Sequence, residues 1–451
     1  MNIAPFTYGV SVGWPSSAIP QLSSVDNPIG IEPITTEDGS WLGGIVCIGA
    51  LAALPVYSII SERFGRKLAN YLIGVPFVIG WFLTYMASSV RVLYVARFII
   101  GLGSGGMLLV TPLYVGEISQ DDIRGTLGSF LLLFLNSGMF ASYILGAYVS
   151  FHAYAVSGVI FSSLYLAANL WLPESPVYLL TKDKHAEALV SLKQLRGDNN
   201  QLAEHELEAL TRTIAESKET TKATIKDVLS SKISRLGLII GVVLCTNQQF
   251  CGIFAVQSYI GNIFQSSGSD LSPEMAAIIV GAIQVVGSSV SSLLMDRAGR
   301  KFLIIVSNTF MAFSLVSIGI YFYLKSVEAS TDGLNWLPVT ALSIFVLSFA
   351  LGMGPVPFVM LSEILSPQTK GLITWISITS LWLCAFIVGK FFSTISNAVG
   401  IHICFWFFAL VCIAGTVFHV LILPETKNKS LEVILKELGG RKKRKENNDH
   451  I

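Results

Sequence analysis

Charge is scarce in this chain. Only 13% of its 451 residues are charged and 52% are hydrophobic, whereas about 25% of a typical soluble protein is charged. A soluble enzyme of this length would need more polar surface than this composition supplies. The net charge of +1 also argues against a broadly basic nucleic-acid-binding protein, so we expect no nucleic-acid partner.

Cysteine and histidine are also sparse, and neither forms a recognisable pattern. All six cysteines stand in apolar runs, where cysteine behaves as a small hydrophobic residue. None lies in an obvious external loop, so we expect no disulfide framework. No cysteine pair has zinc-ligand spacing, the six histidines are scattered, and no Walker A sequence is present. We therefore expect no metal site, no cofactor and no ATP-driven step.

Long apolar runs recur along the whole sequence. A bilayer core about 30 Å thick needs about 20 mostly apolar residues per spanning helix. Such runs lie at approximately 4–21, 41–60, 69–88, 92–116, 126–149, 153–172, 236–264, 276–295, 302–324, 337–361, 372–394 and 401–423. The pattern predicts an all-α integral membrane protein with twelve transmembrane helices. The polar stretch from Val177 to Arg235 has apolar residues at helical spacing and predicts a cytosolic helical linker.

The basic residues predict the orientation. All Lys and Arg residues except Arg91, Arg97, Lys325 and Lys390 fall in the loops after even-numbered spans or in the C-terminal tail. Because cytosolic loops are enriched in Lys and Arg, we expect these loops and both termini to be cytosolic. The RKKRK run at 441–445 fits contact with anionic lipid in the bilayer.

Three loop motifs occur twice, in the same order and at the same places in the two halves. They are ERFGRK at 62–67 and DRAGRK at 296–301, Glu117 and Glu363 followed after six residues by Arg124 and Lys370, and PESP at 173–176 and PETK at 424–427. This repetition predicts two six-helix pseudo-repeats around a central cavity. The expected domains are an N-terminal bundle at 1–176, a linker at 177–235, a C-terminal bundle at 236–427 and a basic tail at 428–451.

The segment from Ile99 to Arg124 carries the most specific motif, a glycine-rich run followed by Tyr114 and Glu117. With the two GRK loops, PESP, QQFCGIF at 248–254, GPVPF at 354–358 and PETKNKSLEVI at 424–434, the chain resembles the sugar porters of the major facilitator superfamily. GWPSSAIP at 13–20, Glu62 and Gln284 are most similar to the insect facilitated trehalose transporter group. The resemblance implies a non-enzymatic carrier that moves a sugar across the cell membrane by alternating access.

Several positions depart from the pattern of that family. Cys251 and Phe254 stand where helix 7 usually has serine and asparagine, and Phe358 replaces a helix-10 tryptophan. Leu381 replaces an asparagine on helix 11, and Leu132 a helix-5 glutamine of well-known hexose carriers. We therefore expect a more apolar pocket than a typical glucose site.

The first span also departs from the family. It contains Pro5, Pro15 and Pro20, and Met1 stands about where the family's first helix is already inside the membrane. Two readings remain open, a short kinked helix or a chain that lacks its true start.

A sugar site needs amide or hydroxyl side chains near the midplane and an aromatic face. At a rise of 1.5 Å per residue, Gln248 and Gln249 lie roughly 18 Å into the seventh span, near the bilayer centre. The predicted substrate-binding residues are Gln248, Gln249, Gln284, Trp382, Phe358, Asn136 and, as an outer-gate residue, Tyr259. The alternatives are that the amides only bond neighbouring helices and that Tyr259 belongs to an interfacial aromatic belt.

Two further groups of residues are predicted to move or hold the helices. Gly354, Pro355 and Pro357 break the tenth span, and this kink is a candidate hinge or a static bend. In the family, ion pairs at the cytosolic helix ends hold the halves together while the cavity faces outward. The predicted gate residues are Glu62, Arg63, Arg66, Glu117, Arg124, Asp296, Arg297, Arg300, Glu363 and Lys370. Simple positive-inside anchoring would explain the basic residues, but not Glu117 and Glu363.

The distribution of acids favours facilitated diffusion. Proton-coupled sugar porters carry an aspartate in helix 1, but the first span here has no acid, and the other spans have only Glu117 and Glu363 at their inner ends. Arg97 and Lys390 lie near outer ends, where we expect them to snorkel. Trehalose or a hexose is the expected cargo, and no obligate protein partner is expected. A proton–sugar symporter and a non-transporting sugar sensor remain as alternatives.

One motif has a misleading form. Gly101 to Gly106 fits the dinucleotide fingerprint G-x-G-x-x-G, but it lies in an apolar helix with no preceding strand. We interpret these glycines as a surface for close helix packing.

Overall fold

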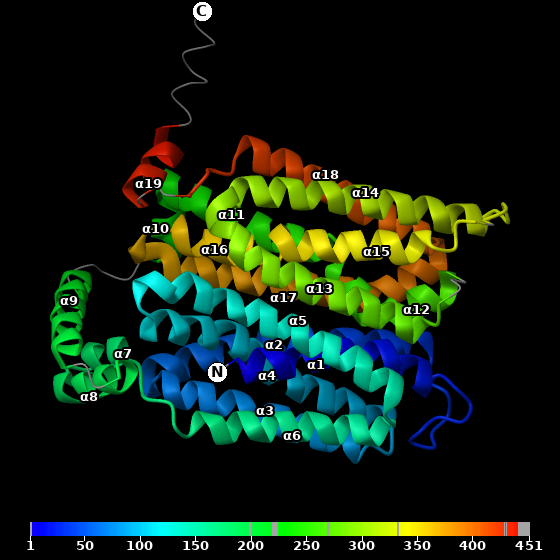
Figure 1. The fold of residues 1–451 in the computed structure, drawn as a ribbon, viewed down its shortest axis with the longest axis horizontal. Helices are drawn as coiled ribbons and strands as arrows, with labels where there is room; N and C mark the ends of the chain where they lie inside the picture. Colours follow the sequence, from blue (N-terminus) through cyan, green and yellow to red (C-terminus); the bar gives the residue numbers. More distant parts are fainter. Residues whose placement is uncertain are drawn as a thin grey trace, which may run out of the picture. The chain divides into compact units, whose positions relative to one another are not determined.

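The structure is a computed structural model. It describes residues 2–440 except for 198–199, 219–223, 268–270, 332, 428 and 430. Every regular element in this part of the chain is a helix (Figure 1). The chain forms two compact units, a first unit from Met1 to Thr221 and a second unit from Lys222 to Ile451.

Eleven helices of the described chain are long and apolar enough to cross a membrane. In the first unit they are α2 (Thr36–Phe64), α3 (Arg66–Tyr85), α4 (Val90–Ile118), α5 (Asp121–Tyr148) and α6 (Phe151–Asn169). The remaining six spans belong to the second unit, where two of them are built from more than one helical piece.

The seventh span consists of α11 (Lys232–Phe250) and α12 (Ile253–Ser267), and the tenth of α15 (Leu337–Ser348), the π-helix η1 (Phe349–Met353) and α16 (Val356–Glu363). The others are α13 (Pro273–Ala298), α14 (Arg300–Ser326), α17 (Pro367–Val399) and α18 (Ile401–Leu421).

The first predicted span is α1 (Ile3–Leu22), which remains helical through Pro15 and Pro20. It is not one of the eleven spans selected by length and hydropathy. Although it has no charged residue, its prolines and serines and its glutamine lower its hydropathy. Its side chains are nevertheless mostly buried, among them Trp14. Together α1 and the eleven other spans make up the twelve predicted helices.

The two units repeat the same helix pairings. In the first unit α1 packs on α5, α2 on α4, and α3 on both α4 and α6. In the second unit α11 packs on α17, α13 on α15, and α14 on both α15 and α18. Each pairing joins helices of corresponding order in the two halves, so the predicted layout of two six-helix repeats is confirmed.

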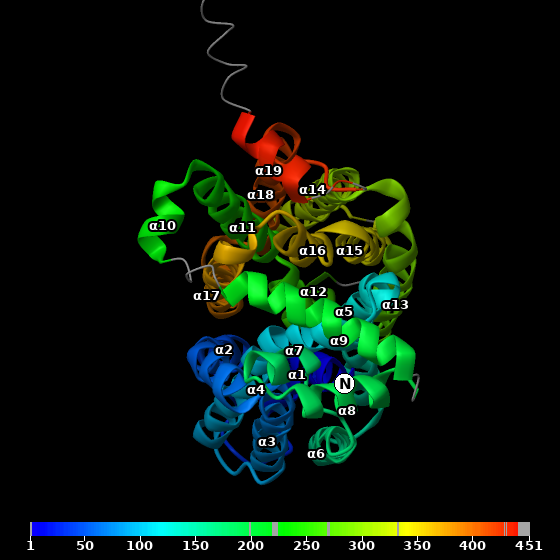
Figure 2. The same ribbon diagram turned by 90° about the vertical axis from the view of Figure 1, so that its left-hand side faces the viewer.

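The predicted linker region is helical and contributes to both units. In the first unit α7 (Pro176–Thr181), α8 (His185–Leu195) and α9 (Asn200–Lys218) pack on one another (Figure 2). Leu207, Leu210 and Ile214 of α9 cover a small core formed by α7 and α8. In the second unit, α10 (Ile225–Ser230) and α19 (Leu431–Gly440) both pack on α11. The basic run at 441–445 lies outside the described residues.

Small residues bring α2 and α4 into backbone contact. A Cβ atom added at Gly101 would lie 3.0 Å from Cα of Gly49 and nearer still to the carbonyl of Val46. A Cβ at Gly105 would collide with the backbone of Ala50. The helix-packing interpretation of the glycine-rich run is therefore confirmed.

This contact predicts a strong size limit at Gly105. Gly105→Leu would force α2 and α4 apart, and overpacking of this kind typically costs about 1–3 kcal/mol. We expect a lower midpoint of thermal unfolding for the detergent-solubilised protein. Gly116→Leu on the same helix is the matched control, since a Cβ there meets nothing within 4 Å. Equal loss of stability in the two variants would contradict close packing at Gly105.

Candidate functional site

Prolines inside the spans leave backbone carbonyls without their helical partners. In an α-helix the N–H of residue i+4 donates to the C=O of residue i, and proline has no N–H. Pro355 therefore deprives the carbonyl of Leu351 of its donor, and Pro357 deprives that of Met353. At this break the N–H of Gly354 donates instead to the carbonyl of Phe349 at 2.7 Å, a π-type bond.

Side chains from neighbouring helices supply the missing donors. Ser291 Oγ of α13 donates to the Leu351 carbonyl at 3.0 Å. Gln248 Nε2 of α11 donates to the carbonyls of Met353 at 3.0 Å and Gly354 at 2.8 Å. Ser291 was not among the predicted functional residues. The sequence signal for such a residue is a proline inside a span. The carbonyl four residues before that proline lacks its helical donor, and a polar side chain on a neighbouring helix can replace it.

The same rule applies in the first unit. Pro76 in α3 leaves the carbonyl of Leu72 without its helical donor, and the hydroxyl of Tyr57 donates to it at 3.0 Å. Pro15 in α1 does the same to the carbonyl of Ser11, which accepts from Arg97 Nη1 at 2.7 Å. At Pro76 and Pro15, therefore, a polar side chain of another helix replaces the missing backbone donor.

Arg97 is buried, with 1% of its surface exposed. Its Nε donates to the carbonyl of Leu42 at 3.1 Å, and its guanidinium carbon lies 5.3 Å from the centre of the Trp14 ring. The expectation that Arg97 snorkels outward is wrong, because carbonyls and an aromatic face inside the bundle stabilise its charge. Lys390, which is 8% exposed, is also buried, contrary to the same expectation.

The predicted sugar-binding residues are buried with one exception. Gln248, Gln249, Gln284, Trp382 and Tyr259 lie buried in the second unit, where Phe358 is half-buried, and Asn136 is buried in α5 of the first unit. Tyr259 donates its hydroxyl hydrogen to the carbonyl of Gly389 at 3.0 Å and packs against the ring of Phe392. The backbone of α12 is kinked at Tyr259.

The seventh span carries buried oxygen atoms that lack a partner. Among the described residues, no hydrogen-bond partner is found for Gln248 Oε1, Ser258 Oγ or Asn262 Oδ1. A buried polar atom left unpaired costs about 1–3 kcal/mol. A polyhydroxyl ligand could satisfy such atoms, since each sugar hydroxyl can donate one hydrogen bond and accept others. Ser258 and Asn262 were not among the predicted sugar-binding residues.

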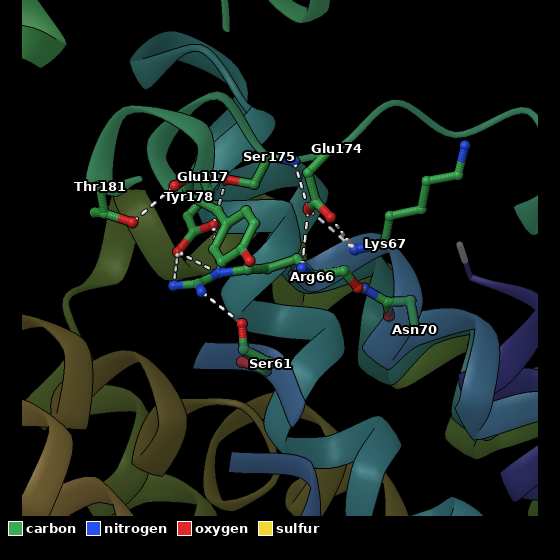
Figure 3. Close-up of polar contacts among 9 residues, drawn as sticks. All are labelled: Ser61, Arg66, Lys67, Asn70, Glu117, Glu174, Ser175, Tyr178 and Thr181. Atoms are coloured by element: carbon green, nitrogen blue, oxygen red, sulfur yellow. Dashed lines mark hydrogen bonds and ion pairs between the residues drawn. The ribbon is translucent and has the colours of Figure 1, made fainter. Parts of the chain in front are cut away.

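A polar cluster at one end of the first unit, the N-half cluster, consists of Arg66, Glu117, Glu174, Ser175 and Tyr178 (Figure 3). Arg66 Nη2 lies 2.9 Å from Glu117 Oε1, and Arg66 Nε lies 3.0 Å from Glu117 Oε2. The Tyr178 ring stands 5.2 Å from the guanidinium carbon. The pair is thus a forked, partly buried ion pair with an aromatic cover.

Glu174 binds the start of α3 rather than a side chain. Its Oε1 accepts the backbone N–H of Arg66 at 2.8 Å and that of Lys67 at 3.0 Å, which are otherwise unpaired at a helix N-terminus. Gly65, with φ +103°, precedes them, and a Cβ there would collide with Glu174. Ser175 Oγ donates to Glu117 Oε2 at 2.5 Å. The PESP motif therefore links α3 to α4.

The second unit repeats this arrangement in a C-half cluster of Arg300, Glu363, Glu425 and Thr426. Arg300 Nη2 lies 3.0 Å from Glu363 Oε1, and Thr426 Oγ1 donates to Glu363 Oε2 at 2.5 Å. Glu425 accepts the N–H groups of Arg300 and Lys301 at 3.1 Å each. The repeated sequence motifs thus produce repeated hydrogen bonding.

The predicted gate residues have different environments. Each of the two ion pairs joins residues of the same unit, Arg66 with Glu117 in the first and Arg300 with Glu363 in the second. Arg63 and Arg297 contribute backbone carbonyls, which accept from Tyr178 Oη and Lys427 Nζ. Glu62 and Lys370 are exposed. The side chains of Arg124 and Asp296 fall outside the described part of the structure.

Glu174, Ser175, Glu425 and Thr426 were not predicted as functional residues. The repetition of PESP and PETK was the signal that could have identified them.

The N-half cluster predicts that Glu117 stabilises the fold. Glu117→Gln removes the charge that faces Arg66, and we expect a loss of about 1–3 kcal/mol in unfolding free energy, measured as a lower midpoint of thermal unfolding in detergent. Glu187→Gln is the control, because its partner Lys184 and Glu187 itself are both more than half exposed. If the Glu117 variant unfolds no earlier than the Glu187 variant, the ion pair has no stabilising role.

The sequence of this chain is similar to those of known transporters. The family model described as "Sugar (and other) transporter" matches residues 2–438. The chain is 34% identical over 434 residues to the facilitated trehalose transporter Tret1 of Bombyx mori, which covers 96% of this chain and 84% of that protein. It is 32% identical over 444 residues to Tret1 of Anopheles gambiae, which covers 98% of this chain and 56% of that protein.

Solved structures show the same fold. The proton:xylose symporter XylE bound to 6-bromo-6-deoxy-D-glucose superposes with a TM-score of 0.78 at 23% identity, with 97% of each chain covered. The inward open conformation of the xylose transporter XylE from E. coli gives a TM-score of 0.78 at 22% identity, with 97% and 98% of the two chains covered. The chain therefore has the fold of the major facilitator superfamily and belongs to the sugar transporter family, whose members are carriers and not enzymes.

Proposed function

We propose that this protein is a facilitative transporter, a uniporter that moves trehalose or a hexose such as glucose across the cell membrane by alternating access. The similarity to facilitated trehalose transporters supports the sugar as cargo. The unpartnered buried oxygens of the seventh span support a polyhydroxyl ligand. Of these atoms, Gln248 Oε1 carries the proposal, because it is buried, has no hydrogen-bond partner in the described part of the chain and lies in the middle of a predicted span.

The proposed sugar-binding residues remain the buried amides and aromatic residues named above. Gln248, Gln249 and Gln284 would bond sugar hydroxyls, and Trp382 and Phe358 would face the C–H surface of the ring. Asn136 would contribute from the first unit, and Tyr259 would act near the outer end of the path. These assignments follow from burial, residue type and the family motif.

Uniport, rather than proton coupling, is supported by the surroundings of Arg97. The neighbouring helix α1 contains neither Asp nor Glu. The partners of Arg97 include the Ser11 carbonyl and hydroxyl, the Leu42 carbonyl and the Trp14 ring. None of these four groups exchanges a proton at physiological pH, so they offer no route for coupling sugar movement to a proton gradient.

The two polar clusters are proposed to lie at the cytosolic ends of the spans, which also places both termini in the cytosol. This follows from the excess of basic residues in the corresponding loops. The clusters would stabilise the state in which the sugar path is closed to the cytosol. Their ion pairs would weaken as the path opens inward.

The proposal predicts sugar uptake that does not depend on a proton gradient. Oocytes expressing the chain should take up labelled trehalose or labelled glucose in a saturable manner, and a protonophore should leave the initial rate unchanged. Loss of uptake with the protonophore would indicate a symporter instead. Surface-expressed protein that binds trehalose or glucose but transports neither sugar would indicate a sensor. Surface-expressed protein that neither binds nor transports these sugars would contradict the proposed function.

Gln284 offers a test of the site. Gln284→Met keeps the length of the side chain but removes its amide, and losing one hydrogen bond worth about 0.5–1.5 kcal/mol would raise KM by about 2- to 12-fold. Ser289→Ala on the same helix is the control, because Ser289 is exposed and bonds only within α13. An unchanged KM for the Gln284 variant would remove Gln284 from the site.

A further inference from the structure

A short helix leads directly into the seventh span. Helix α10 packs on α11 (Figure 2), and Ser231 both ends α10 and begins α11. Thr224 and Asp227 form a capping box at the start of α10, in which the side chain of each accepts the backbone N–H of the other. The start of α10 and its junction with the span are thus both defined by hydrogen bonds.

The apolar side of α10 is covered only in part by the described chain. Val228 is 1% exposed, whereas Ile225 is 59% and Leu229 50% exposed. At about 100° per residue, these three side chains form one continuous stripe that covers about 100° of the helix surface. The stripe therefore continues past the edge of the protein, where two large apolar side chains would lose the benefit of burial if they faced water.

The start of α11 has an exposed face of its own. Lys232, Arg235 and Ile239 are exposed and lie within about 60° of one another around the helix. This face changes from basic to apolar between Arg235 and Ile239, about 6 Å along the helix. A lipid-facing span changes in this way where headgroups give way to acyl chains. Because α10 packs beside α11 and ends five residues before Arg235, it lies at the level of the headgroups.

The same segment carries positive charge beside the apolar stripe. Residues 224–235 contain three basic residues, Lys226, Lys232 and Arg235, and one acid, Asp227. Lys226 lies next to the stripe, about 60° from Leu229 around the helix. Asp227 lies about 160° from Ile225, on the far side of α10, and its carboxylate accepts hydrogen bonds at the helix start. The charge nearest to the stripe is therefore positive.

We propose that α10 and the start of α11 form a binding surface for an anionic phospholipid of the bilayer. Ile225 and Leu229 contact the upper part of the acyl chains. Lys226, Lys232 and Arg235 contact the negatively charged headgroup. An apolar side with positive charge along its border is what binding to an anionic membrane surface requires. In the orientation proposed above, this surface faces the cytosolic leaflet, where anionic lipids are concentrated.

A protein partner fits this surface less well than lipid. The exposed face of α11 runs without interruption from α10 into the membrane-spanning part of the helix at Ile239. Acyl chains are therefore the apolar phase nearest to Ile225 and Leu229. A second protein would have to displace lipid from this face before it could cover both side chains.

The test places a fluorescent probe on α10 in the full-length protein. All six native cysteines are buried, so a cysteine introduced at an exposed position can be labelled selectively. Leu229→Cys is compared with Ser230→Cys, which is also exposed but lies about 100° further from the stripe. Each labelled protein is placed in nanodiscs that contain equal fractions of nitroxide-labelled phosphatidylcholine or nitroxide-labelled phosphatidylserine, with the nitroxide on the upper part of an acyl chain.

The nitroxide quenches a fluorophore that it contacts, so quenching reports the lipid beside the probe. We expect quenching at Leu229 to be at least about 2-fold stronger than at Ser230, because Leu229 lies on the stripe. At Leu229, phosphatidylserine should quench at least about 2-fold more than phosphatidylcholine. A basic residue near an anionic surface typically strengthens binding by about 5-fold, so three such residues are sufficient for this preference.

Charge variants separate headgroup recognition from apolar contact. In the Leu229→Cys protein, Lys226→Gln combined with Arg235→Gln should remove more than half of the preference for phosphatidylserine. Quenching by phosphatidylcholine should stay within about 1.5-fold, because the apolar stripe is unchanged. Arg212→Gln on α9 is the matched control, since it removes an arginine whose side chain is 80% exposed and should keep the full preference.

The outcomes decide the proposal without reference to sugar transport. Equal quenching at the two probe positions, or quenching at neither, would overturn the contact with lipid. Quenching without a preference for phosphatidylserine, or a preference that survives the loss of Lys226 and Arg235, would overturn the recognition of an anionic headgroup. Should Leu229→Cys fail to fold, Ile225→Cys takes its place, because Ile225 lies on the same stripe and is similarly exposed.

Discussion

A carbonyl that proline deprives of its helical partner must find another donor, because the bilayer core offers no water. Four prolines in this structure have such a carbonyl bonded by a side chain from another helix: Pro15 with Arg97, Pro76 with Tyr57, Pro355 with Ser291 and Pro357 with Gln248. Polar side chains, which are unfavourable inside a bilayer, are therefore held in these spans by hydrogen bonds to backbone carbonyls. Arg97 is the clearest case, since a carbonyl exposed by a proline helps to keep a full charge inside the bundle.

The two units share their helix pairings but not the continuity of their helices. In the first unit α1 and α4 run without interruption, whereas the corresponding seventh and tenth spans of the second unit are broken at Gly252 and between η1 and α16. Broken helices leave polar backbone atoms to be satisfied, and the side chains that satisfy them keep other polar atoms buried. Gln248 is the example: its nitrogen bonds the break in the tenth span while its oxygen stays buried. Most of the proposed sugar-binding residues also lie in this unit.

Much of this structure was predictable because its signals are local. Runs of apolar residues predicted the spans, and the repetition of ERFGRK, PESP and their counterparts predicted the duplicated bundle. The positions of Arg97 and Ser291 were not predictable in the same way. Whether Arg97 snorkels or turns inward depends on a carbonyl of α1 that lies 86 positions away along the chain. Similarly, the helical pattern shows that Gln248 is deep in the membrane, but not that its nitrogen is already engaged by the tenth span.

Each polar cluster contains two kinds of interaction, hydrogen bonds from main-chain N–H groups to a carboxylate and an ion pair between two side chains. Glu174 and Glu425 bind main-chain N–H groups at the start of α3 and α14, and these bonds do not depend on the rotamers of Arg66 or Arg300. Arg66 and Glu117, like Arg300 and Glu363, contact each other only through flexible side chains, so rotation about side-chain bonds is enough to separate them. Loss of the ion pair would therefore leave the start of α3 or α14 bonded through its main-chain N–H groups.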